Sequence, residues 1–122
     1  WSNLTWTRDG FAEVTTNGQA GGSGQEIWFN NINLVFVFCR QLTGLTLKFG
    51  EYGGNLSIKI NDDFQNFENF DNIDGSTIGG ALVTITGDGD GQGMGTLSLS
   101  GSIDSFSIGG QELAIDDVCP QQ

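Results

Sequence analysis

The chain of 122 residues has fifteen Asp and Glu, four Lys and Arg, no histidine and a formal net charge of -11. This length predicts one domain, residues 1–122, with a core of its own, and the negative field makes nucleic acid and anionic membranes poor partners. Twenty glycines and one proline, beside many Ser, Thr and Asn residues, indicate short strands joined by tight turns.

Aromatic residues mark the first third of the chain. The chain opens on Trp1 without a methionine or an apolar leader, which favours a mature, secreted, extracellular protein. Trp28 lies between Ile27 and Phe29 and is predicted to face away from both, on an exposed side of a strand. Trp1, Trp28 and Tyr52 are therefore the predicted contacts for a sugar ring or a neighbouring subunit.

One segment of the chain occurs nearly twice. Gly24–Ile32 returns as Gly110–Val118: a glycine, a Gln-Glu pair, a short apolar stretch, two Asn or Asp residues and a β-branched residue. We expect the two copies to form two strands of one fold. A cysteine follows each copy, Cys39 and Cys119, and we expect these two residues to form a disulfide, with two separate buried thiols as the alternative. The loop of about 80 residues that such a bond closes would contribute roughly 4–5 kcal/mol.

Apolar and polar residues alternate along most of the remaining chain, a pattern typical of half-buried antiparallel strands. Leu34–Phe38 is apolar on both faces and is therefore expected at the centre of the fold. It is far too short to span a bilayer. Turn residues separate the segments. The pattern predicts an all-β, two-sheet antiparallel sandwich that resembles a jelly roll. The inward residues are expected to be Leu45, Leu47, Phe49, Leu56, Ile58, Ile60, Val83, Ile85, Leu97 and Leu99.

The segment 64–73 departs from this alternation. Phe64, Phe67 and Phe70 recur every three residues, and Ile73 continues the series. This spacing predicts a short helical crossover with its aromatic rings directed into the core.

Catalytic motifs are scarce in this composition. Without histidine there is no Ser-His-Asp triad, no Cys-His pair and no imidazole ligand for zinc, so we do not expect an enzyme. The alternative is a glycoside-active enzyme with paired carboxylates. Its candidate residues are Glu26, Glu51, Glu112, Asp116 and Asp117.

Three clusters of oxygen-bearing side chains could bind calcium, the one expected cofactor. Asp88 and Asp90 open like a calcium loop but lack its closing acid, and Asn61–Asp63 forms a second cluster. The third joins Asn30 and Asn31 to Asp116 and Asp117 if the two copies lie side by side. The alternative for all three clusters is turn chemistry, which uses the same residue types.

Four segments carry a resemblance that covers most of the chain from Ala20 onward. They are Ala20–Glu26, Leu45–Leu56, Phe67–Phe70 and Ile108–Cys119, and they resemble a group of predicted secreted bacterial proteins without an established activity. The resemblance implies a β-sandwich outside the cell. Two differences from the group are the lack of an additional strand before Trp1 and the alanine at Ala114, where an aromatic residue is expected.

These features lead to two expected functions. A sandwich that lacks an edge strand leaves backbone groups unpaired, and another copy could fill the gap by strand addition. We therefore expect a noncatalytic extracellular structural or adhesive protein that self-associates through β-strand contacts, as a matrix fibre or surface layer. The alternative is a carbohydrate-binding module that recognises an extracellular polysaccharide.

Overall fold

The computed structural model describes residues 3–87 and 93–122, and within them every regular element except one 3₁₀ helix is a β-strand. The elements are β1 (Asn3–Thr15), β2 (Glu26–Phe36), β3 (Leu42–Glu51), β4 (Leu56–Ile60), β5 (Asp63–Phe67), η1 (Phe70–Ile73), β6 (Thr77–Ile78), β7 (Ala81–Gly87), β8 (Gly93–Ile103), β9 (Phe106–Gly110) and β10 (Leu113–Gln121).

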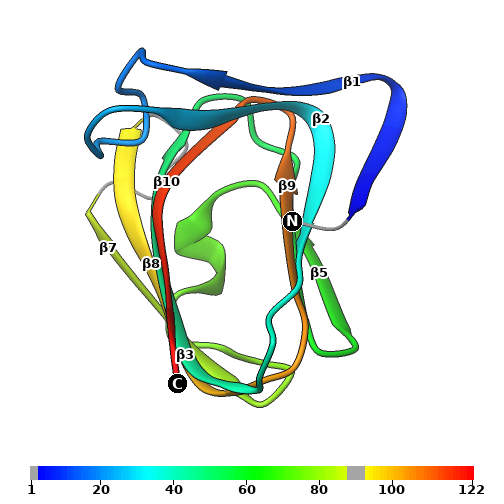
Figure 1. Ribbon diagram of the computed structural model, residues 1–122, viewed down its shortest axis with the longest axis vertical. Helices are drawn as coiled ribbons and strands as arrows, with labels where there is room; N and C mark the ends of the chain where they lie inside the picture. The colour runs from blue at the N-terminus through cyan, green and yellow to red at the C-terminus, as the bar shows by residue number, and fades with distance from the viewer. Residues whose placement is uncertain (1–2, 88–92) are drawn as a thin grey trace.

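The strands form one antiparallel sheet in the order β5-β4-β9-β2-β10-β3-β8-β7-β6, and β1 pairs with β2 (Figure 1). The sheet is nearly closed into a barrel. At the seam, Gly79 in the β6–β7 turn donates its backbone N–H to Asp63 Oδ2 of β5 at 2.9 Å. The predicted all-β antiparallel class is confirmed. The predicted division into two sheets is not seen, because hydrogen bonds run without a break from β5 to β6.

β9 and β10 act as one long strand along β2. Phe29 faces Leu113 and Ile32 faces Gly110, so no residue is gained or lost between the two ladders. On its other side β9 pairs with β4, whereas β10 pairs with β3. β2 and the β9–β10 strand therefore belong to both halves of the barrel, one half continuing through β4 and β5 and the other through β3, β8 and β7.

The two copies of the repeated segment lie side by side and run in opposite directions. Trp28 and Ala114 are equivalent positions in the two copies, and they face each other in the β2–β10 ladder. Asn31 and Asp117 are also equivalent, and both have left-handed backbones, with φ of 55° and 49°. Asn and Asp tolerate this conformation better than other residues with a side chain. At Asp117 the β10–β3 register shifts, so the paired Asn or Asp residues of the repeat mark an interruption in a strand.

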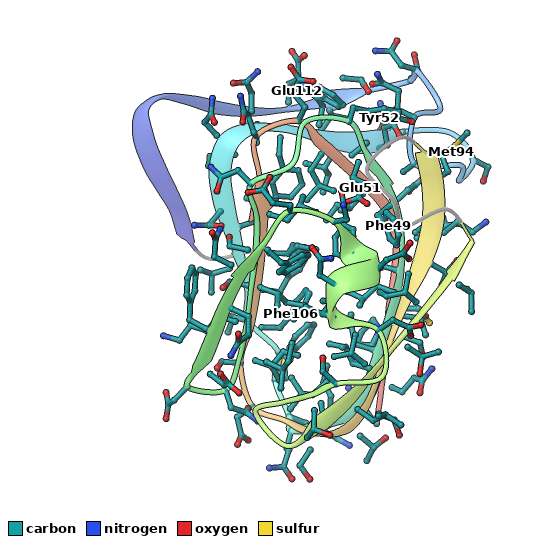
Figure 2. The ribbon with its side chains drawn as sticks, turned by 180° about the vertical axis from the view of Figure 1, so that it is seen from behind. Phe49, Glu51, Tyr52, Met94, Phe106 and Glu112 are labelled. Atoms are coloured by element: carbon teal, nitrogen blue, oxygen red, sulfur yellow. The ribbon has the colours of Figure 1, made fainter. Side chains whose placement is uncertain are left out.

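The core fills the barrel as the alternation predicts. All ten residues expected to face inward are buried. The helix η1 lies between the two halves of the barrel (Figure 1), where the ring centroid of Phe70 is 4.1 Å from that of Phe49. Glu51 is also directed inward from β3, and its buried carboxylate accepts the Phe70 N–H (Figure 2).

The expectation for residues 64–73 is wrong in its first half. Asp63–Phe67 is the strand β5, joined to β4 by a tight hairpin turn in which Asn61 has φ of 56°. Within the described residues helical structure is confined to η1, and Phe67, Phe70 and Ile73 are buried as expected, whereas Phe64 is not. In a strand, residues three apart lie on opposite faces. Phe64 accordingly faces outward and is 56% exposed.

Candidate functional site

The predicted aromatic contacts Trp28 and Tyr52 lie together at one end of the barrel. Their ring centroids are 6.3 Å apart, and the Tyr52 hydroxyl donates to the Gln19 carbonyl at 2.7 Å. Burial of the phenol, followed by the nearby Glu26 carboxylate, raises the pKa of Tyr52. Trp1, the third predicted contact, lies outside the described residues.

A loop between β1 and β2, residues 16–25, covers the outer face beside this aromatic pair. A Cβ on Gly50 would overlap the Gln19 carbonyl, so glycine at this position lets the loop approach β3. Glu26 fixes the position of this loop, because its buried carboxylate accepts the N–H groups of Gln19 at 2.9 Å and Ala20 at 2.7 Å. Trp28 and Tyr52 therefore border a packed loop.

The four residues expected to share a calcium site are not brought together. The antiparallel register carries Asn30 and Asn31 beyond one end of the β2–β10 ladder, and Asp116 and Asp117 beyond the other. Asn31 Nδ2 donates to Asn30 Oδ1 at 3.0 Å. That the protein binds calcium stays a prediction.

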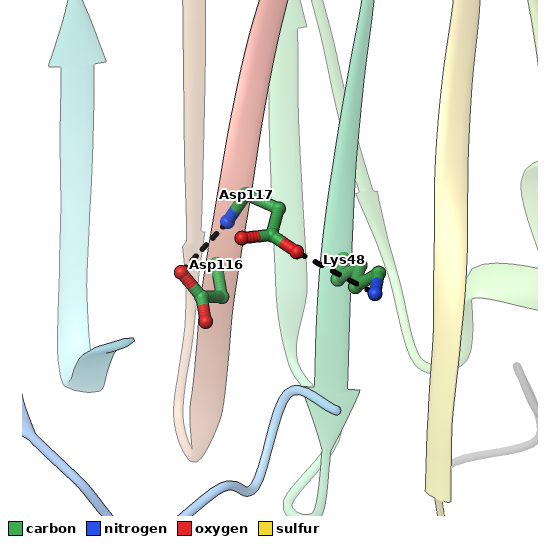
Figure 3. Close-up of polar contacts among 3 residues, drawn as sticks. All are labelled: Lys48, Asp116 and Asp117. Carbon is green, nitrogen blue, oxygen red and sulfur yellow. Dashed lines mark hydrogen bonds and ion pairs between the residues drawn. The ribbon is translucent and has the colours of Figure 1, made fainter. Parts of the chain in front are cut away.

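Asp116 and Asp117 have partners of their own (Figure 3). Asp116 Oδ1 accepts the Asp117 N–H at 2.7 Å, and Asp117 Oδ2 lies 3.4 Å from Lys48 Nζ. This ion pair is exposed at the surface, where such pairs contribute little stability. Asp88 and Asp90 lie outside the described residues. In the parts of the chain that the structure describes, no three His, Cys, Asp or Glu side chains gather in a group that could hold a metal ion.

The expected disulfide is not formed. Cys39 and Cys119 are free, and both are exposed, which also differs from the alternative of two buried thiols. Cys119 faces Thr46 in the β10–β3 ladder, whereas Cys39 precedes β3, which begins at Leu42. The extended residues 42–46 separate the two thiols along β3, and a disulfide requires Cα atoms within about 7 Å of each other.

The carboxylates of the enzyme alternative have different environments. Glu26 and Glu51 are buried and accept backbone N–H groups. Glu112 is exposed beside Tyr52, whose N–H donates to the Glu112 carbonyl at 3.0 Å (Figure 2).

A different site lies on the outer face of β2, β9, β4 and β5, around a hollow of about 160 Å³. Its lining combines amide and hydroxyl side chains with one exposed aromatic ring, Phe64. None of its side chains carries a charge, although the whole chain is strongly acidic. The lining residues are Asn31, Ile32, Asn33, Asn55, Ser57, Phe64, Asn66 and Gly110.

The pairing register of four strands and the absence of a side chain at Gly109 form this hollow. Asn33, Gly109, Ser57 and Asn66 form one row across four strands. A Cβ on Gly109 would overlap the Asn33 side chain. Because that space is open, Ser57 Oγ donates to Asn33 Oδ1 across β9.

Hydrogen bonds fix the orientation of the two outer amides of the row. Asn66 Nδ2 donates to Asn55 Oδ1 at 3.1 Å and to the Leu56 carbonyl at 2.8 Å. Within the described part of the chain, Asn33 Nδ2 and Asn66 Oδ1 have no hydrogen-bond partner. A donor and an acceptor are thus held ready on the open face beside an aromatic ring.

This hollow is not predicted by the sequence pattern. Alternation with Leu56 and Ile58 predicts Ser57 on the outer face of its strand, but the three-residue spacing predicts Phe64 in the core. Asn33 directly precedes the apolar run Leu34–Phe38, and no pattern in the sequence places it beside Ser57. The available signal was the three-residue spacing of Phe64 and Phe67, because a strand over these residues must turn one ring outward.

Comparison of the chain with protein-family models, with curated proteins and with solved structures gives no match. Among the residues that the structure describes, none of the helical segments has the length and apolar character needed to cross a membrane.

Proposed function

We propose that this protein is a noncatalytic, extracellular carbohydrate-binding domain whose binding face is the outer surface of β2, β9, β4 and β5. One observation carries the proposal: Phe64, exposed at the hollow, stands beside Asn33, Ser57 and Asn66, whose amide and hydroxyl groups lie in one row. An aromatic ring can stack on a sugar ring, and planar amides can bond its hydroxyls.

The uncharged lining of the hollow and the negative charge of the whole chain both favour an uncharged ligand. The hollow offers uncharged donors and acceptors, while the net charge of -11 repels polyanions at long range. A neutral polysaccharide satisfies both conditions.

The test is a pull-down of the protein with insoluble cellulose, xylan and chitin. Wild-type protein is expected to bind at least one of them, and Phe64→Ala is expected to reduce binding at least about tenfold, since stacked aromatic rings contribute strongly to binding. Leu82→Ala is the matched control, because Leu82 is an exposed apolar residue on β7, outside the hollow. Equal binding by Phe64→Ala and wild type would remove the basis of the proposal.

Self-association through β-strand contacts, as in a structural or adhesive subunit, is a second candidate. It is supported by β1, which is long and pairs only with β2 within the described residues. Val14 on this strand is 62% exposed. An open strand edge can pair with the same edge of another copy.

Light scattering tests this candidate. If β1 mediates association, the wild-type mass should rise with concentration, and Val14→Lys should return it to that of one chain, because a charge on an edge strand opposes strand addition. Thr84→Lys on β7 is the control for added charge. A constant mass of one chain for the wild type would exclude the candidate.

We also propose a description of the architecture. We regard the nearly closed barrel as a bent, jelly-roll-like sandwich, since β2 and the β9–β10 strand pass from one half to the other as corner strands do in orthogonal packings.

A further inference from the structure

A second hollow lies next to the first on the same outer face. Its volume is about 140 Å³. Its lining comes from β2, β4 and β9, three of the strands that also line the first hollow, together with the turns that follow β4 and precede β9. The lining residues are Val35, Lys59, Asn61, Asp62, Ser105, Phe106 and Ser107.

The two hollows follow each other along the strands. Asn55 and Ser57 line the first hollow, and Lys59 and Asn61, the next residues of the same alternation, line the second. At 3.3 Å per residue, the path from Asn55 to Asn61 is at most about 20 Å long. This length is enough for several consecutive sugar rings.

Groups that can bind hydroxyls continue along the path. Phe64 faces Lys59 in the β4–β5 ladder, where the two hollows meet. Lys59 faces Ser107 on β9, and within the described residues neither side chain has a hydrogen-bond or ion-pair partner. Asn61 instead forms a fixed wall, because its Nδ2 donates to the Gly79 carbonyl at 2.7 Å and its Oδ1 accepts the Asp104 N–H at 2.8 Å.

From this arrangement we propose that the ligand is an internal stretch of a linear, uncharged polysaccharide that lies along the strands and occupies both hollows. The inference rests on the proposed carbohydrate-binding function and adds the ligand's shape to it. Phe64 stacks on a ring in the first hollow, and Lys59 and Ser107 bond the hydroxyls of rings further along. A single terminal sugar would fill only one hollow.

Calorimetric titration with cello-, xylo- and chito-oligosaccharides, from disaccharide to hexasaccharide, tests this inference. For the series that binds, affinity is expected to rise at least about tenfold between the shortest and longest members. Lys59→Ala and Ser107→Phe should each reduce this gain of affinity with length. Thr84→Phe, on the outer face of β7, is the control for added bulk.

The outcomes separate the inference from the proposed function. If Phe64→Ala abolishes binding but affinity does not depend on length, or both second-hollow variants keep the full gain, one hollow binds sugar and the extended path is wrong. If no oligosaccharide binds to the wild type, the function and the inference fail together. The Lys59→Ala variant serves if Ser107→Phe does not fold.

Discussion

Glu26 and Glu112 occupy equivalent positions in the two copies of the repeated segment, yet their surroundings differ. Glu26 is buried and accepts two backbone N–H groups of the 16–25 loop and the Thr15 hydroxyl. Glu112 is exposed. The same residue type is thus an anchor at one position, where the 16–25 loop bonds to it, and a surface charge at the other.

Glu26→Gln should therefore destabilise the protein by roughly 2 kcal/mol, since hydrogen bonds to a charged group contribute about 1.5–3 kcal/mol and the amide nitrogen cannot accept them. Urea denaturation measures the change in the free energy of unfolding. Glu112→Gln is the matched control and should change it by less than about 0.5 kcal/mol. Equal effects of the two substitutions would show that Glu26 does not anchor the loop.

At the scale of elements, the seam between β5 and the β6–β7 turn closes the sheet. Asp63 links them by accepting the Gly79 N–H, and this bond, followed by one from Gln65, lowers the pKa of Asp63. A carboxyl group whose pKa is lower in the folded state stabilises the fold above its unfolded pKa. That stabilisation is lost as the pH falls through the lowered value.

Asp63→Ala should consequently lower Tm at neutral pH, and the difference from wild type should disappear in acid, once the wild-type carboxyl is protonated. Thermal unfolding at pH 7 and below pH 3 measures both differences. Asp62→Ala is the control, because Asp62 is the exposed neighbour in the same turn. A Tm difference that persists unchanged in acid would mean that the ionised carboxylate does not stabilise the seam.

At the scale of the whole molecule, alternation predicted which residues fill the barrel but not which outward residues meet. Leu56, Ile58 and Ile60 are readable from the local pattern, because burial of one face imposes a period of two. Asn33 lies on β2, distant in the chain from the β4–β5 hairpin that carries Ser57 and Asn66, and only the register across β9 brings it beside them. A single segment contains no information about that register.

The direction of the strands explains why the four Asn and Asp residues of the repeat do not form one cluster. The repeated segment correctly predicted two strands of one fold, and the structure places these strands side by side. The expected cluster of Asn30, Asn31, Asp116 and Asp117 also required these strands to end at the same place. Because the strands pair antiparallel with Trp28 opposite Ala114, the equivalent ends of the two copies lie at opposite ends of the ladder. The repeat therefore describes two matching strand interruptions, at Asn31 and at Asp117.

The central claim is that the outer face of β2, β9, β4 and β5 binds carbohydrate. The most direct test is NMR titration of the labelled protein with the oligosaccharide that binds most tightly. If carbohydrate binds here, the largest amide shifts are expected at Asn33, Ser57 and Asn66 and should extend to Lys59. Largest shifts at Trp28 and Tyr52, or no shifts on this face, would contradict it.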